Sequence, residues 1–296
     1  MARAVRLTML TVHNKIQPMA ERRRELIDLI DRAGRAGCDI MVLPECADHH
    51  RTNEAIAAHE SGSRAAVRET LGLSLESPWL QQVMGLARKH KTVIVPCVVH
   101  KDGPRTYTAS LVFGPDGALL GSYNKTHLAP GEERVLDWGN HLDPIPTPFG
   151  RIGIQICWDF HFPEISRVYE LKGAELQFWT TMRQGWWERE LYHAVLPARC
   201  FTHGTPLGVS TFALDEQLLH RGVMNSAILD AFGQTLAGGI QGSNGFVSAT
   251  VDLDQRPQTH KEWNVPELVD YPRYLQTQRR TDLYSVLTAP LPGKSV

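Results

Sequence analysis

The sequence predicts a layered α/β protein in which helices cover much of a β-sheet. Short apolar segments rich in β-branched residues alternate with longer amphipathic segments along most of the 296-residue chain, a pattern typical of sheets flanked by helices. Hydrophobic residues make up 42% of the chain and charged residues 21%, so enough apolar side chains are present for a large core. We therefore expect one compact domain as the default organisation.

The first half of the chain opens with a predicted strand and an amphipathic surface helix. Leu26 and Ile30 belong to the apolar stripe of this helix, whose opposite face is charged. The short apolar strand that follows it stops at Pro44. The predicted elements are, in order, the strand Val5–Val12, the helix Met19–Arg35, the strand Asp39–Leu43, the helix Pro78–His90, the strand Thr92–Val99, and a hairpin of Tyr107–Phe113 with Ala118–Tyr123.

The second half continues the alternation of strands and helices. Its predicted elements are the strand Arg151–Ile156, a helix from about Pro163 to Lys172, the strand Leu176–Thr180, a long helix Trp186–His203, the strand Leu207–Phe212, and the late strands Ser226–Leu229 and Gly245–Asp252. Beyond Asp254, prolines, charges and aromatic residues replace the periodic pattern. We therefore expect a domain over residues 1–254 and an extension over residues 255–296 that packs on the body or on a partner subunit.

Charge and cysteine usage exclude several functional classes. The 31 basic and 32 acidic residues nearly cancel, so neither nucleic acid nor a membrane is an expected partner. No apolar run reaches the length of a membrane-spanning helix, and the five cysteines are scattered without zinc-binding spacing. The thirteen histidines also lack a metal-ligand pattern. We expect a cytoplasmic protein with reduced thiols and no metal, acting on a small neutral or zwitterionic molecule.

Three polar residues stand directly after predicted strands: Glu45, Lys125 and Cys157. Alone, each has an ordinary structural explanation as a solvated carboxylate, a surface ion-pair partner or a small core side chain. Ligands in α/β proteins gather at the carboxyl ends of strands, and together these residues supply a base, a charge stabiliser and a nucleophile. Burial would raise the pKa of Glu45 towards that of the thiol. The backbone N–H of Trp158 is a candidate second donor to an oxyanion.

The same residues lie in segments that resemble a known family. Leu43-Pro44-Glu45, Tyr123–Leu128 and Gly153–Asp159, in this order and spacing, are similar to the three signature segments of the nitrilase superfamily of carbon–nitrogen hydrolases. The resemblance covers about Val5 to Asp252. It implies a four-layer αββα sandwich, a Glu-Lys-Cys triad, no cofactor, and assembly into a homodimer or larger homo-oligomer.

The resemblance also suggests further site residues. A second glutamate follows the lysine in several amidases of the family, and Glu133 is our candidate for it, with the adjacent Glu132 as the alternative. Asp159 stands where true nitrilases commonly carry glutamate, which favours amides over nitriles. His161 could line the pocket. Arg183 could bind a substrate carboxylate, as carbamoyl-amino-acid hydrolases need, or could form an ordinary surface ion pair.

We therefore expect a hydrolase that cleaves a small amide or N-carbamoyl compound through a cysteine thioester and releases ammonia or an amine. A nitrilase converting a nitrile to an acid and ammonia is the nearest alternative. Acyl transfer to another acceptor could start from the same thioester. A non-catalytic binding protein with the same fold is the alternative from a different class.

Overall fold

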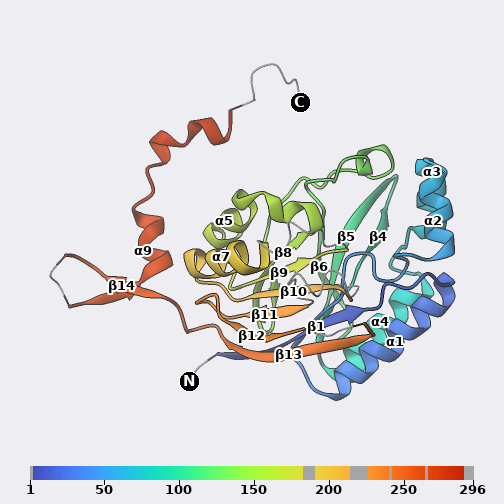
Figure 1. Ribbon diagram of the computed structural model, residues 1–296, viewed down its shortest axis with the longest axis horizontal. Helices are drawn as coiled ribbons and strands as arrows, with labels where there is room; N and C mark the ends of the chain where they lie inside the picture. The colour runs from blue at the N-terminus through green and yellow to red at the C-terminus, as the bar shows by residue number, and fades with distance from the viewer. Residues whose placement is uncertain (1–2, 183–190, 214–225, 240–241, 264–265, 290–296) are drawn as a thin grey trace.

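The computed structural model describes residues 3–182, 191–213, 226–239, 242–263 and 266–289. Its centre is a large curled β-sheet with helices on its outer faces (Figure 1). The sequence expectation of a four-layer αββα sandwich is confirmed. Arg183, Trp186 and Trp187 lie outside the described residues. Among the described residues, no helix is long and apolar enough to cross a bilayer.

The sheet consists of two parallel halves joined through its first strand. In the first half, β1 (Ala4–Val12) pairs in parallel with β2 (Ile40–Val42), which pairs in parallel with β3 (Val93–Val95). In the second half, β8 (Gly150–Ile156), β9 (Leu176–Thr180) and β10 (Leu207–Phe212) are parallel neighbours. The halves join where Thr11 and Val12 pair with Thr211 and Phe212.

Antiparallel strands extend both halves. The predicted strand over residues 92–99 divides at Pro96, because proline offers no N–H to the ladder. Its second part, β4, pairs with β5, and β5 pairs with β6 in the predicted hairpin. The additional strands are β4 (Cys97–Asp102), β5 (Arg105–Phe113), β6 (Leu119–Asn124), β7 (Ile145–Thr147), β11 (Ala227–Leu229), β12 (Thr235–Gly238) and β13 (Gly245–Asp252), the last of which pairs along the whole of β1.

Alternating side chains of each strand pack into different layers. On β1, Leu7 and Met9 enter the core between the two sheet halves, where they join Ile154 of β8 and Phe178 of β9. Leu10, the next residue of β1, instead packs against helices on the outer face. This period-two alternation places a buried layer on each side of every central strand.

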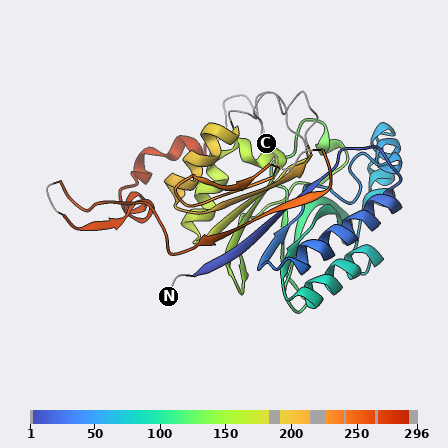
Figure 2. The same cartoon turned by 60° about the horizontal axis from the view of Figure 1, so that its bottom comes forward.

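Helices cover the outer faces of both halves (Figure 2). The first half is covered by α1 (Met19–Arg35) and α4 (Pro78–His90), and the second half by α5 (Pro163–Leu171) and α7 (Leu196–His203). Residues 186–190 of the predicted helix over residues 186–203 lie outside the described part of the chain; its remainder is a five-residue π-helical segment, Leu191–Val195, followed by α7. Two short helices that the sequence pattern did not indicate, α2 (Asn53–Glu60) and α3 (Arg64–Leu71), follow β2; Thr52 caps the first and Ser63 the second.

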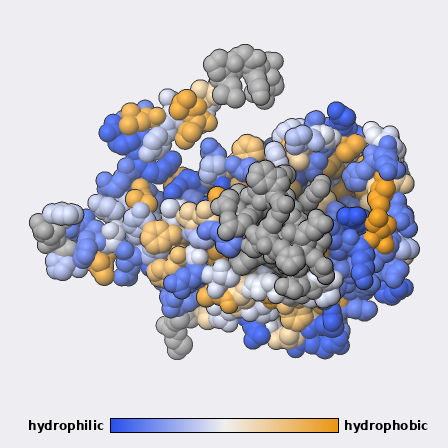
Figure 3. All heavy atoms as spheres, in the orientation of Figure 1, coloured by the Kyte–Doolittle hydropathy of each residue, from blue (hydrophilic) through white to orange (hydrophobic). Residues whose placement is uncertain are grey.

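The C-terminal segment leaves the body as an arm (Figure 1). It contains the hairpin of β14 (Gln258–His260) and β15 (Leu268–Asp270), then α9 (Tyr271–Thr277) and two short 3-10 turns, Thr281–Leu283 and Ser285–Leu287. Helix α9 contacts the body, since the ring of Tyr271 lies 5.4 Å from that of Phe201 on α7. Further along, Val286 and Leu287 are 75% and 63% exposed. Apolar side chains are visible on this projecting segment in Figure 3.

Candidate active site

Three strand ends bring Glu45, Lys125 and Cys157 together. Glu45 stands three residues beyond β2, and Lys125 and Cys157 directly follow β6 and β8. The Lys125 Nζ donates a hydrogen bond to Glu45 Oε1 at 2.9 Å, and both side chains are buried. Cys157 lies beside both side chains, since Glu45 and Lys125 each shift the pKa of its thiol. The structure therefore brings Glu45 and Lys125 into contact, with Cys157 beside them.

The second glutamate beside the lysine is Glu132. Its Oε2 lies 2.9 Å and its Oε1 3.1 Å from Lys125 Nζ, and Oε2 also accepts the Ala129 N–H at 2.8 Å. Our preferred candidate, Glu133, is exposed and accepts the N–H of Gly131 at 2.7 Å. The prediction that Glu133 lies beside Lys125 was therefore wrong. Gly131, with a φ of 96°, starts a 3-10 turn in which Glu132 points inwards and Glu133 points outwards.

Lys125 holds its charge between two carboxylates. Burial by itself lowers the pKa of Lys125, but Glu45, Cys157 and Glu132 raise it well above its usual value. Lys125 is therefore a fixed cation at the centre of the site. Its own backbone N–H donates to Thr108 O of β5 at 2.9 Å, which ties the lysine to the sheet.

Glu45 is held as a hydrogen-bond acceptor with a high proton affinity. Burial raises its pKa and the negative charge of Glu132 raises it further, whereas Lys125 opposes the shift. Its Oε2 also accepts the Met182 N–H at 2.9 Å. A carboxylate whose pKa is raised is better matched to accept a thiol proton and later to return a proton to a leaving group.

Cys157 sits in a left-handed backbone conformation, with a φ of 47°. Such a conformation in a residue other than glycine costs on the order of 1–3 kcal/mol and occurs preferentially at functional sites. The Trp179 Nε1–H donates to the Cys157 carbonyl at 3.0 Å and helps hold this turn. Burial and the negative charges of Glu45 and Glu132 raise the pKa of the thiol, while Lys125 and a hydrogen bond from Thr181 lower it. The proton therefore stays on sulfur until a base removes it.

Asp159 connects the lysine loop to the cysteine turn. This fully buried carboxylate accepts the Tyr123 hydroxyl at 2.8 Å, the His127 N–H at 2.8 Å and the Ile156 N–H at 2.9 Å. Tyr123 lies near the end of β6, the strand that leads to Lys125, and Ile156 precedes Cys157. Asp159 therefore fixes the relative positions of the ammonium and the thiol. From the sequence, Asp159 had a part only in favouring amides over nitriles, because its hydrogen-bond partners become visible only in the folded structure.

The remaining predicted residues are placed as follows. Trp158 is partly exposed, and its ring lies 4.5 Å from that of the exposed His161. This pair borders the cysteine turn on its solvent side. Arg183 lies outside the described residues. Among the described side chains, no group of three or more His, Cys, Asp or Glu residues is placed to hold a metal ion.

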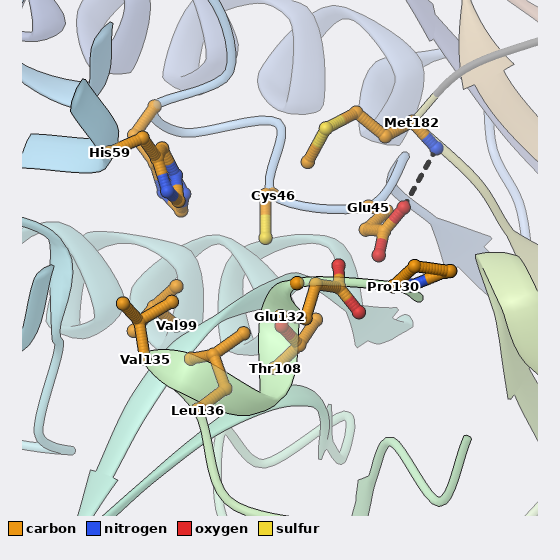
Figure 4. Close-up of a pocket in the computed structure, with 12 residues that line it drawn as sticks. Glu45, Cys46, His59, Val99, Thr108, Pro130, Glu132, Val135, Leu136 and Met182 are labelled. Carbon is orange, nitrogen blue, oxygen red and sulfur yellow. Dashed lines mark hydrogen bonds between the residues drawn. The ribbon is translucent and has the colours of Figure 1, made fainter. Parts of the chain in front are cut away.

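A cavity of about 230 Å³ begins at the two glutamates (Figure 4). Glu45 and Met182 lie at one side of it and His59 at the other, with Cys46 between them and Val135 on the facing wall. Most of its lining is apolar. The cavity could not be predicted from the sequence, because its walls come from segments far apart in the chain, between Glu45 and Met182.

Comparison with known proteins identifies the family that this chain resembles along most of its length. A family model described as "Carbon-nitrogen hydrolase" matches residues 8–261. The chain is 29% identical over 222 residues to the probable nitrilase C965.09 of Schizosaccharomyces pombe, covering 73% of this chain and 76% of that protein. It is 25% identical over 272 residues to omega-amidase NIT2 of Xenopus tropicalis, covering 87% of this chain and 89% of that protein.

Solved structures share the fold. An amidase from Nesterenkonia sp. superposes with a TM-score of 0.72 at 20% identity over 96% of both chains. A carbon–nitrogen hydrolase from Helicobacter pylori G27 superposes with a TM-score of 0.71 at 18% identity, covering 98% of this chain and 99% of that one. At these identities the likeness concerns the fold alone.

Proposed function

The chain belongs to the carbon–nitrogen hydrolase family, and we propose that it hydrolyses a small amide or N-carbamoyl compound with Cys157 as nucleophile. The observation that carries the proposal is the position of Lys125 Nζ, 2.9 Å from carboxylate oxygens of both Glu45 and Glu132, with the Cys157 thiol near enough for all three groups to shift its pKa. A nucleophile, a base with a raised pKa and a buried cation thus meet at one point.

In the first half-reaction, Glu45 takes the thiol proton and the Cys157 sulfur attacks the carbonyl carbon. The negative charge that develops on the carbonyl oxygen is stabilised by Lys125 and by the backbone N–H of Trp158. Collapse of the tetrahedral intermediate breaks the carbon–nitrogen bond, and Glu45 returns the proton to the departing nitrogen. The products of this step are a thioester on Cys157 and ammonia or an amine.

In the second half-reaction, Glu45 removes a proton from water, and the hydroxide attacks the thioester. The carbon–sulfur bond then breaks and the thiol regains the proton, which releases the carboxylic acid. Glu132 contributes by holding Lys125 in place and by keeping the pKa of Glu45 high. Every step uses only these side chains, the Trp158 N–H and water.

The names of similar proteins agree with amide chemistry without fixing the substrate. One relative is called an omega-amidase, another a probable nitrilase, and a structural neighbour an amidase. A nitrile would be attacked by the same thiol but would need two additions of water. Product analysis therefore separates the two reactions.

The decisive experiment compares the wild-type protein with Cys157→Ala. Both are incubated with aliphatic amides, aryl amides, N-carbamoyl amino acids and nitriles, and ammonia, amine and acid products are identified by mass spectrometry. We expect product release by the wild type and none above background by Cys157→Ala. The matched control is Cys38→Ala, which removes a partly exposed thiol that precedes β2 and should hydrolyse the same compounds. Equal turnover by Cys157→Ala and the wild type would refute the proposal.

We also propose that the protein assembles as a homo-oligomer through its C-terminal arm. Leu283, Val286 and Leu287 expose 62%, 75% and 63% of their surface. Apolar side chains that are gathered at the end of a projecting segment are typical of an arm that packs on a second subunit.

A further inference from the structure

We propose that the cavity beside Glu45 and Glu132 binds a substituent on the departing nitrogen, so that the enzyme cleaves N-substituted amides and releases a substituted amine. This inference rests on the proposed function and adds the leaving-group side of its substrate. It depends on which reacting groups face the cavity, on the chemistry of the walls, and on the size of the side chain at position 46.

The cavity borders the proton-transfer groups of the site. Both Glu45 and Glu132 line it, whereas Cys157 and Trp158 do not. In amide hydrolysis the carbonyl carbon must lie at the thiol and the carbonyl oxygen at the oxyanion donors. The nitrogen must lie beside the group that protonates it, which is Glu45. A group attached to that nitrogen therefore extends past Glu45 into the cavity.

The size and walls of the cavity fit an apolar substituent larger than the hydrogens of ammonia. An apolar cavity of roughly 150 Å³ accepts benzene, and this cavity measures about 230 Å³. The apolar lining side chains are Cys46, Val99, Pro130, Val135, Leu136 and Met182. A butyl or benzyl group would exchange water for contacts with these walls, at a gain of roughly 0.8 kcal/mol for each buried methylene.

The charges around the cavity favour a neutral substituent over an anionic one. Two carboxylates face it, and burial lowers the pKa of His59 below its usual value. His59 is therefore uncharged at neutral pH. His49 also lines the cavity, and its Nδ1 is hydrogen-bonded to the buried Asp48 carboxylate at 2.8 Å. With both glutamates in its wall, the described part of the cavity repels a carboxylate on the leaving amine, such as that of an amino acid.

Cys46 keeps the cavity open next to the reacting groups. It directly follows Glu45, and its left-handed backbone, with a φ of 50°, is held by hydrogen bonds from the His49 and His50 N–H groups to its carbonyl at 3.1 and 2.8 Å. Its side chain lies between Glu45 and His59 (Figure 4). A larger side chain at this position would occupy the space that we assign to the amine substituent.

In the reaction, the Cys157 sulfur forms a bond to the acyl carbon of the N-substituted amide while the bond from that carbon to nitrogen breaks. The proton taken from the thiol by Glu45 passes to the nitrogen, so a neutral primary amine leaves through the cavity. Water then converts the thioester to the acid and restores the thiol. Reactants and products balance with water as the only co-reactant.

The test uses amides that share one acyl group, chosen as the best acyl group in the substrate panel. The compounds are the primary amide, the N-butyl and N-benzyl amides, and the N-acylglycine, in which the departing amine is glycine. We expect kcat/KM for the N-butyl or N-benzyl amide to exceed that for the primary amide by about tenfold or more, from the burial of apolar groups. We expect kcat/KM for the N-acylglycine to be lower than that for the primary amide and for the N-alkyl amides.

Variants at the cavity wall connect this preference to the cavity. Cys46→Phe should lower the ratio of kcat/KM for the N-benzyl amide to that for the primary amide by about tenfold or more. Cys46→Ala, which removes the thiol without filling space, should retain the wild-type ratio within about threefold. Val135→Phe fills the facing wall and should act like Cys46→Phe, so the test does not depend on one variant folding.

The outcomes separate the two proposals. Cys157-dependent cleavage of the primary amide with a tenfold weaker reaction of every N-substituted amide would refute the amine site and leave the proposed function standing. An unchanged substrate ratio in folded Cys46→Phe and Val135→Phe would also refute the amine site. Absence of Cys157-dependent cleavage of all these amides would refute the proposed function, and the amine site with it.

Discussion

Replacing Glu132 by glutamine tests the most specific feature of the site, because its neighbour Glu133 provides a matched control. Both residues are glutamates on the same short turn, but only Glu132 contacts Lys125 Nζ, at 2.9 and 3.1 Å. Glu132→Gln keeps the shape and one acceptor oxygen while removing the charge. Glu133→Gln makes the same chemical change at a carboxylate that accepts the Gly131 N–H on the surface.

The expected size of the effect follows from the charged hydrogen bonds between Glu132 and Lys125, which the substitution weakens. A hydrogen bond to a charged group contributes roughly 1.5–3 kcal/mol, and about 1.4 kcal/mol corresponds to a tenfold change in rate. We therefore expect Glu132→Gln to lower kcat/KM by about 10- to 100-fold. Lys125 retains its hydrogen bond to Glu45 at 2.9 Å, so the protein should remain folded.

A pH profile gives a second readout that a loss of folding would not produce. The charge of Glu132 raises the pKa values of Glu45 and Cys157, so both should fall when that charge is removed. As pH increases, kcat/KM rises when the base loses its proton. In Glu132→Gln this rise should therefore occur at lower pH than in the wild type. The assay is initial-rate product release across the pH range, with unfolding temperatures measured in parallel. Equal losses of activity in Glu132→Gln and Glu133→Gln, or an unshifted profile, would refute the reasoning.

Three further changes to the chain probe the positioning network, a buried histidine and the C-terminal arm. Asp159→Asn should lower the free energy of unfolding by roughly 2–4 kcal/mol, since an amide nitrogen cannot accept the hydrogen bonds that the buried carboxylate receives. Urea denaturation measures this free energy, and a value within about 1 kcal/mol of the wild type would contradict the network. Burial and the charges of Arg167 and Arg199 lower the pKa of His203 from 6.5 to about 3, so the unfolded chain binds a proton that the folded state excludes and stability is lost as pH falls below 6.5. Between pH 7 and pH 5, His203→Gln should lose about 2 kcal/mol less stability than the wild type. Urea titrations of both proteins measure this, and an equal loss of unfolding free energy in the two would show that His203 is not a buried neutral imidazole. Truncation after Asp254 should leave a folded body and reduce the subunit number measured by light scattering, whereas an unchanged subunit number would show that the arm does not join subunits.

Several elements of the fold follow from the sequence because local patterns decide them. The helix Met19–Arg35 was predicted at its observed bounds, since its apolar stripe repeats at helical spacing. The hairpin through Gly114 and Gly117 was predicted because the turn residues fix it. Helices α2 and α3 were missed because their apolar residues are few and their starts depend on single capping side chains, Thr52 and Ser63.

The candidate site divides in the same way. The sequence by itself determined that Glu45, Lys125 and Cys157 follow strands, and parallel strands carry their carboxyl ends to one edge of a sheet. Only the tertiary structure decided between Glu132 and Glu133, because the left-handed Gly131 controls which side chain of the turn reaches Lys125. It also decided the cavity, whose walls are residues distant in the chain that meet only after both halves of the sheet have packed. Spacing along a chain predicts which residues a strand end presents, but the direction of a side chain in a turn and the volume between segments depend on long-range packing.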